Sequence, residues 1–175
     1  MSGMRDPRPH LGEPTALDLL NTRWMSSDGL QDLLSDVDGV RCWLATNGLA
    51  DRCQADDEVR SALVATREAI LAVVEHRSTD DLNAVLDRGR IRRTLGESGP
   101  QELADVPQPW LAPWLAADNL LSLLGDAPDR IKQCAHEHCV LWFYDTSKNG
   151  ARRWCSMALC GNRAKAARHY AAKRD

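Results

Sequence analysis

The sequence predicts a mainly α-helical fold, with a helical N-terminal domain over residues 1–128 and a small cysteine-containing module over residues 129–175. Apolar residues recur at three- and four-residue intervals through most of the N-terminal domain, which is the period of an amphipathic helix. The charge changes sign at the boundary. The first segment carries 12 Arg and no Lys against 21 Asp plus Glu, a net charge of −9, whereas the second carries 10 Lys plus Arg against 4 acids, a net charge of +6.

Caps and apolar spacing place the helices of the N-terminal domain in chain order. Pro14 begins the first helix, because proline is tolerated in a first turn, and Gly48 ends the second as a C-cap. The third helix carries a broad apolar face that includes Val59, Leu63 and Ile70. The four predicted helices cover residues 13–22, 30–47, 56–77 and 80–89.

The helical pattern breaks over residues 91–109. Glycines and Pro100 interrupt it there, which indicates either a short β-hairpin or an irregular connection. Helical spacing returns over residues 110–124. The domain junction is therefore predicted near residues 125–130, where the charge also changes.

Two cysteine pairs of equal spacing define the C-terminal module. Four residues separate Cys134 from Cys139, four separate Cys155 from Cys160, and fifteen residues lie between the pairs. Zn²⁺ in structural sites takes four ligands in a tetrahedron, and two such pairs on tight turns can converge on one ion. The spacing thus predicts a structural Zn²⁺ site with these four thiolates as its ligands.

Other roles for the cysteines and their neighbours are less favoured. Disulfides require an oxidising compartment, and the N-terminus has neither an apolar signal core nor a cleavage site, so we expect a cytoplasmic protein. His136 or His138 could replace one sulfur ligand, but four thiolates already complete a site. Cys42 and Cys53 are expected to be buried as small apolar side chains. No apolar run approaches the roughly twenty residues that cross a bilayer.

The order of elements in the module is that of a treble-clef-like zinc finger. A knuckle carries the first cysteine pair, residues 140–144 form an apolar β-like run, and residues 145–150 form a turn. The second knuckle ends at Cys160, and a helix follows over residues 162–173. In the turn, Asp145 could orient Arg152 or Arg153, or it could be a turn residue only, and we expect the turn role with an added salt bridge.

Two motifs carry a resemblance to a known family. The segment Arg152–Met157, followed by Cys160-Gly161-Asn162-Arg163 with Lys165 and Tyr170, resembles the CGNR zinc finger of bacterial proteins. Upstream, Leu17–Thr22 resembles the opening of the ABATE domain that precedes that finger. The resemblance covers nearly the whole chain. It implies a stress-related bacterial transcription regulator with four zinc-binding cysteines.

Basic residues of the finger suggest contact with DNA. Four of them share one face of the C-terminal helix, and three more adjoin the ligand cysteines. The alternatives are a solvated helix packed onto the finger by its alanines, and arginines that neutralise the metal–thiolate charge. Trp142, Phe143 and Trp154 are expected in the core rather than stacked on bases. The predicted DNA-contacting residues are Arg152, Arg153, Arg163, Lys165, Arg168, His169 and Lys173.

A small polar cluster lies on the first helix. Asp18, Asn21 and Thr22 occupy positions i, i+3 and i+4, so one face carries a carboxylate, an amide and a hydroxyl. This face could line a pocket for a small-molecule effector, or it could form a buried hydrogen-bond network that fixes the helix. The sequence leaves both interpretations open.

The combined prediction is a DNA-binding transcription regulator that is not an enzyme. The chain contains no Gly-rich phosphate loop, nucleophile elbow or HExxH motif. The main alternative is a protein-interaction module whose basic finger docks an acidic partner, and a metal-dependent enzyme is less favoured. No membrane partner is expected, and a homodimer is left open.

Overall fold

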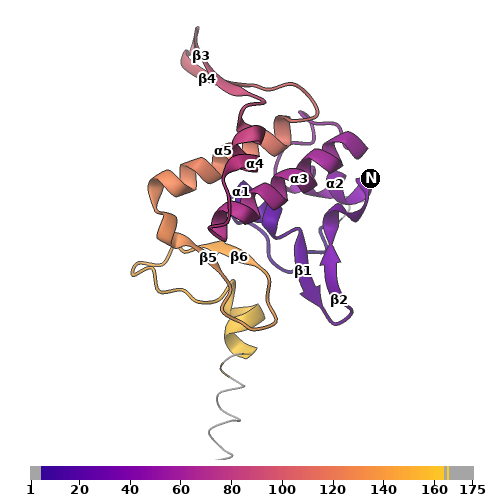
Figure 1. The fold of residues 1–175 in the computed structure, drawn as a ribbon, viewed down its shortest axis with the longest axis vertical. Helices are drawn as coiled ribbons and strands as arrows, with labels where there is room; N and C mark the ends of the chain where they lie inside the picture. Colours follow the sequence, from indigo (N-terminus) through magenta and orange to yellow (C-terminus); the bar gives the residue numbers. More distant parts are fainter. Residues whose placement is uncertain (1–4, 164, 166–175) are drawn as a thin grey trace, which may run out of the picture.

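The computed structural model describes residues 5–163 and residue 165, and combines helices with small sheets (Figure 1). Within this part of the chain, 44% of residues are helical and 18% are in strands. The prediction of a mainly α-helical fold is therefore wrong, because three two-stranded antiparallel sheets accompany the helices. The strands of each sheet are too short to give a long alternation of apolar and polar residues, so the three- and four-residue spacing of the helices is the main pattern in the sequence.

The helical part is organised around α3, which contacts each of the other long helices. Asp56 begins α3 by accepting a hydrogen bond from the backbone N–H of Val59 at 2.8 Å. The core that it forms includes the fully buried side chains of Leu63 and Ile70. Of the helices described, none is long and apolar enough to cross a membrane. The helices are α1 (Thr15–Leu20), α2 (Val37–Thr46), α3 (Asp57–Val74), α4 (Asp80–Leu86) and α5 (Leu111–Asp126).

The strands form three separate pairs. In the first, Trp24 pairs with Gln31; in the second, Arg93 pairs with Glu102; in the third, Lys132 pairs with Phe143. The second pair projects from the body as a long hairpin at the top of Figure 1, so of the two alternatives left open for residues 91–109, a short hairpin or an irregular connection, the structure has a hairpin. The strands are β1 (Arg23–Ser26), β2 (Gly29–Asp32), β3 (Arg90–Gly96), β4 (Gly99–Asp105), β5 (Ile131–Gln133) and β6 (Trp142–Tyr144).

The helix predicted over residues 30–47 is wrong in its first third. Residues up to Asp32 belong to β2, and a short 3₁₀ turn, Leu33–Ser35, follows. The helix begins only after Asp36, whose carboxylate accepts a hydrogen bond from the backbone N–H of Gly39 at 2.8 Å. The β1–β2 hairpin was not predicted, although Gly29, with φ of +102°, allows its tight turn.

The C-terminal module is docked on the helical part. β6 contacts α1, and Trp142 of β6 is a member of the main core cluster. Glu13 just before α1 accepts a hydrogen bond from the backbone N–H of Tyr144 at 2.9 Å. Trp24 of β1 packs against both the main core and the smaller core around the C-terminal cysteines. The two parts therefore share buried side chains as well as polar contacts.

Candidate metal centre

Two turns, at residues 134–139 and 155–161, position the four cysteines. Cys134 directly follows β5, and the chain turns back at Cys139, whose N–H donates to the carbonyl of His136 at 2.9 Å. In the second pair, Cys155 precedes a π-helical turn, Met157–Gly161, and Cys160 lies within that turn. Ser156 caps this turn by accepting a hydrogen bond from the backbone N–H of Leu159 at 3.0 Å. Local turn chemistry thus aims both pairs at one point.

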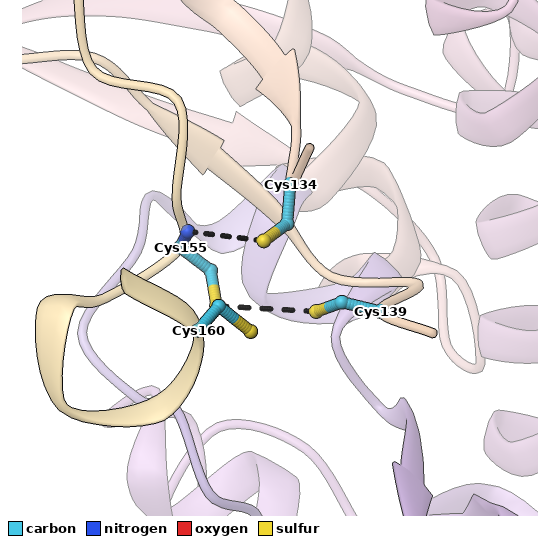
Figure 2. Close-up of side chains that lie close together, drawn as sticks. All are labelled: Cys134, Cys139, Cys155 and Cys160. Atoms are coloured by element: carbon cyan, nitrogen blue, oxygen red, sulfur yellow. Dashed lines mark hydrogen bonds between the residues drawn. The ribbon is translucent and has the colours of Figure 1, made fainter. Parts of the chain in front are cut away.

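The four sulfur atoms converge (Figure 2). All four Sγ atoms lie within 4.8 Å of one another. The Sγ atom of Cys155 is 3.9 Å from that of Cys139 and 3.7 Å from that of Cys160. A tetrahedral site with Zn–S bonds of about 2.3 Å has sulfur–sulfur edges of about 3.8 Å. The spacing of the donors therefore fits a tetrahedral ion such as Zn²⁺.

The electrostatics of the cluster favour a bound cation. The hydrogen bond from Cys155 lowers the pKa of Cys139 to about 5. The same interaction raises the pKa of Cys155 well above its usual range, and burial raises the pKa of Cys160 to about 12. A divalent cation resolves the conflict because it stabilises several neighbouring thiolates at once.

Backbone and side-chain donors surround the cluster. The backbone N–H of Cys155 donates to the Sγ atom of Cys134 at 3.4 Å. Arg152 donates to the backbone carbonyl of Cys155, which holds the loop that carries this ligand. Such contacts orient ligands and offset their negative charge when a metal is bound.

Comparisons with known families agree with this geometry. A family model of the CGNR zinc finger matches residues 130–173, and the model of the ABATE family, described as "Putative stress-induced transcription regulator", matches residues 13–127. The chain belongs to the ABATE family. Both predicted matches are confirmed in the expected order, and all four thiols lie inside the CGNR match. No curated protein matches the chain.

A buried carboxylate organises the CGNR finger of this ABATE-family protein. Asp145 accepts hydrogen bonds from Lys132 Nζ at 2.8 Å, from the hydroxyl of Ser147 at 2.6 Å and from the backbone N–H of Arg152 at 2.9 Å. Burial alone would raise the pKa of this carboxyl, but the donors, led by Lys132, hold it well below its usual value of 3.8. A salt bridge is present at this turn, but its cation is Lys132 and not Arg152 or Arg153; Arg152 reaches Asp145 only through its backbone N–H.

Arg152 is used inside the finger. Its Nε atom donates to the carbonyl of Trp154 at 2.9 Å, and its guanidinium lies 4.3 Å from the ring centre of Phe143. Together with the contact to Cys155, these interactions occupy the side chain. Phe143 itself is fully buried, as predicted for a core residue.

The other predicted DNA-contacting residues differ in their surroundings. Arg153 is exposed, and its guanidinium lies 5.3 Å from the ring centre of Trp154. Arg163 and Lys165 are also exposed, just after the last cysteine. Three predicted contacts and most of the helix predicted over residues 162–173 lie outside the described residues: Arg168, His169 and Lys173.

The three polar residues of α1 and its end are buried and hydrogen-bonded. The carboxylate of Asp18 accepts from Arg8 Nη1 and Asn47 Nδ2, each at 2.9 Å. The amide of Asn21 bonds to the backbone of Trp142. These contacts favour the interpretation as a network that fixes the helix, and the effector role of these residues stays a prediction.

Thr22 completes the network and connects it to α3. Its Oγ1 atom donates to the carbonyl of Leu19 at 2.7 Å and accepts from Arg67 Nη1 at 2.8 Å. Arg67 also forms a two-pronged ion pair with Asp32, with both N–O distances at 2.7 Å. Arg67 was missed in the sequence, although its place between Leu63 and Ile70 on an apolar helix face marks it as buried.

Proposed function

We propose that this chain is a DNA-binding transcription regulator whose finger is assembled on one Zn²⁺. Cys134, Cys139, Cys155 and Cys160 would hold the ion, which supplies a structural cross-link and no reaction chemistry. The membership of the ABATE family, described in terms of transcription regulation, supports the regulatory role. Thiolate ligands persist in a reducing compartment, so the proposal places the protein in the cytoplasm.

The observation that carries the proposal is the placement of charge. The finger segment has a net charge of +6, and the remainder of the chain has a net charge of −9. Arg153, Arg163 and Lys165 are exposed on the finger, whereas Arg152 is occupied by internal contacts. DNA phosphates attract the first surface and repel the second, so the charges orient the protein with its finger toward the duplex.

The chain's own residues set the rigidity of this surface. The carboxylate of Asp145 and the guanidinium of Arg152 fix the loop between the cysteine pairs, next to the exposed Arg153. A loop held in this way keeps its cations in place without a further ordering cost on binding. We propose no catalytic role for the protein.

The test measures binding of the zinc-loaded chain to genomic fragments and to random duplex DNA by fluorescence anisotropy across a range of salt concentrations. We expect tighter binding to some genomic fragments. The variant Arg153→Ala/Lys165→Ala should weaken binding to all sequences and lower the slope of log affinity against log salt by roughly 0.9 for each phosphate that the variant no longer neutralises.

A matched control is available on the helical part. Arg41 is exposed and paired with Asp38, far from the finger in sequence, so Arg41→Ala should leave both affinity and salt slope unchanged. Absence of any salt-dependent DNA binding by the folded, metal-loaded chain contradicts the proposal. It would favour the alternative of a basic finger that docks an acidic protein.

A further inference from the structure

A cavity of about 470 Å³ lies where the helical part meets the finger. Its apolar wall combines Val73 and Val74 at the end of α3 with Leu124 of α5. Pro128 of the connection and Ile131 of β5 close the side nearest the finger. This size is within the range of small-molecule sites, which are mostly apolar clefts with a few placed polar groups.

The polar edge of the cavity begins with an unusual helix end. After α3 the N–H of Arg77 donates to the carbonyl of Ala72 at 2.8 Å, and the N–H of His76 donates to that of Val73 at 2.9 Å. This pair of bonds is the Schellman motif, whose left-handed residue is usually glycine. Here it is His76, with φ of +56°. A side chain is strained at this position, and His76 is one of the residues that line the cavity.

The residues that line the cavity favour a ligand with a negative charge. Beyond His76, the edge carries the guanidinium of Arg77 and the hydroxyls of Ser78 and Thr79. None of the nine described residues that line the cavity is acidic, although this part of the chain is strongly acidic. An arginine with adjacent hydroxyls and an imidazole matches a carboxylate, and the apolar wall is aliphatic rather than aromatic.

We propose that this cavity binds a small aliphatic monocarboxylate, with its hydrocarbon chain against the apolar wall and its carboxylate at Arg77. The guanidinium of Arg77 is available for this contact because its ion pair with Glu75 lies at the solvent-exposed surface. The N–O distance of that pair is 2.8 Å, but the two side chains are 57% and 41% exposed. Exposed ion pairs of this kind are weak.

The position of the cavity gives the ligand a route to the finger. A bound carboxylate would contact α3 and α5 together with Pro128 and Ile131, and β5 leads directly to Cys134. This step rests on the proposed function. A ligand that shifts the position of β5 would move the adjoining finger and so change its affinity for DNA. By linkage, DNA would then change the affinity for the ligand by the same factor.

The binding test is calorimetric titration of the full, zinc-loaded chain with octanoate as the probe and octanamide as its uncharged control. We expect saturable binding of octanoate with a Kd of about 1 mM or tighter, as its size allows. Octanamide should bind at least tenfold more weakly, because it cannot form the charge-assisted hydrogen bond. Equal binding of both compounds, or no saturable binding of octanoate, overturns the proposal.

Two variants separate a binding role from a structural one. Arg77→Gln should weaken octanoate about tenfold or more, whereas Arg60→Gln, which removes another paired arginine at the far end of α3, should not. His76→Gly should raise Tm by about 2–4 °C, because glycine relieves the left-handed strain, while weakening octanoate binding. A residue with only a structural role would not give opposite changes in stability and binding. Unchanged octanoate affinity in both variants contradicts the assignment.

Failure of this proposal can be distinguished from failure of the proposed function. If octanoate binds but the chain does not bind DNA, the cavity is retained and the regulatory role is lost. If DNA binds in a salt-dependent way and octanoate does not, the regulatory role is retained and the cavity assignment is lost. Where both bind, a shift of the DNA affinity by saturating octanoate measures the coupling directly.

Discussion

The side chain of Asn21 holds the backbone of Trp142 on both sides. Its Nδ2 atom donates to the carbonyl of Trp142 at 2.9 Å, and its Oδ1 atom accepts from the N–H of Trp142 at 2.8 Å. Both groups are buried, and they join the end of α1 to the first residue of the finger strand β6. The finger is therefore fastened to the helical part by an amide that imitates a neighbouring β-strand.

Replacing Asn21 with Ala should destabilise the whole chain. The change leaves a buried N–H and a buried carbonyl without partners, which costs about 2–4 kcal/mol of unfolding free energy. Urea denaturation followed by tryptophan fluorescence measures the loss. Asn149→Ala, at an exposed turn position, serves as the control and should stay within about 0.5 kcal/mol of the wild type. Equal stabilities of the two variants would show that the amide contact does not fasten the finger.

Removing the metal should affect more than the finger. We expect one metal ion per chain, and we expect Cys155→Ser or a chelator to abolish its binding. Loss of the ion should change the tryptophan fluorescence, because Trp24 packs against both the cysteine cluster and the main core, to which Trp142 belongs. Most helical circular dichroism should remain, because α3 and α5 pack on each other independently of the cysteines. Metal analysis by mass spectrometry checks the stoichiometry. A metal-free chain with unaltered fluorescence contradicts the expected coupling.

The two adjacent arginines of the finger should separate folding from binding. Arg152→Ala removes internal hydrogen bonds and the contact with Phe143, so it should lower the unfolding free energy by about 1–3 kcal/mol. Arg153→Ala should leave stability within about 0.5 kcal/mol and weaken DNA binding instead. Thermal unfolding and anisotropy on the same samples check both. Reversed effects would show that the exposed and internal roles were assigned to the wrong residues.

The charge of Asp145 should make the finger sensitive to acid. Its pKa in the folded chain is depressed, so the ionised carboxylate stabilises the fold above the unfolded value of 3.8, and this contribution is lost as pH falls through the folded pKa. Asp145→Asn should therefore destabilise the chain at pH 7, and the difference from the wild type should narrow below pH 3.8. Denaturation curves at several pH values measure it. A difference that does not change with pH would indicate a role through shape alone.

Replacing Asp18 tests the two interpretations of its cluster. Its carboxylate is one of two that pair with the buried guanidinium of Arg8, and Asp6 remains as the other, so Asp18→Ala should cost about 1–3 kcal/mol. Asp6→Asn/Arg8→Met/Asp18→Leu removes all three charges of the cluster and should be less destabilised than the single variant. A stable Asp18→Ala chain that had lost only effector binding would favour the ligand interpretation.

Local sequence predicted that the four cysteines lie together, because each pair lies on one tight turn. Capping side chains such as Ser156 act within three residues, so spacing alone carries the geometry. The opening of α2 was mispredicted for a related reason. Leu30, Leu33 and Leu34 have helical spacing, but the burial of the last two is achieved by a strand followed by a 3₁₀ turn. The period of three or four does not distinguish these arrangements over so few residues.

Partners that are distant in sequence could not be predicted. Asn21 and Trp142 are 121 residues apart, and no pattern in one sequence links them. The same holds for the Arg67–Asp32 ion pair, because Asp32 lies 35 residues before Arg67 and is not part of α3. The cavity beside His76 is also lined by three stretches that are separate in the sequence: residues 73–79, Leu124 and residues 128–131. Tertiary packing, and not local propensity, decides each of these.

The place of α1 has a consequence for the order in which the chain folds during synthesis. This helix is made early, yet it packs against α5 and β6, which leave the ribosome late. α1 can pack against α3 sooner, but its contacts with α5 and the hydrogen bonds of Asn21 to β6 must wait until these partners have been translated. α1 therefore cannot complete its native contacts until the finger strand β6 has emerged from the ribosome.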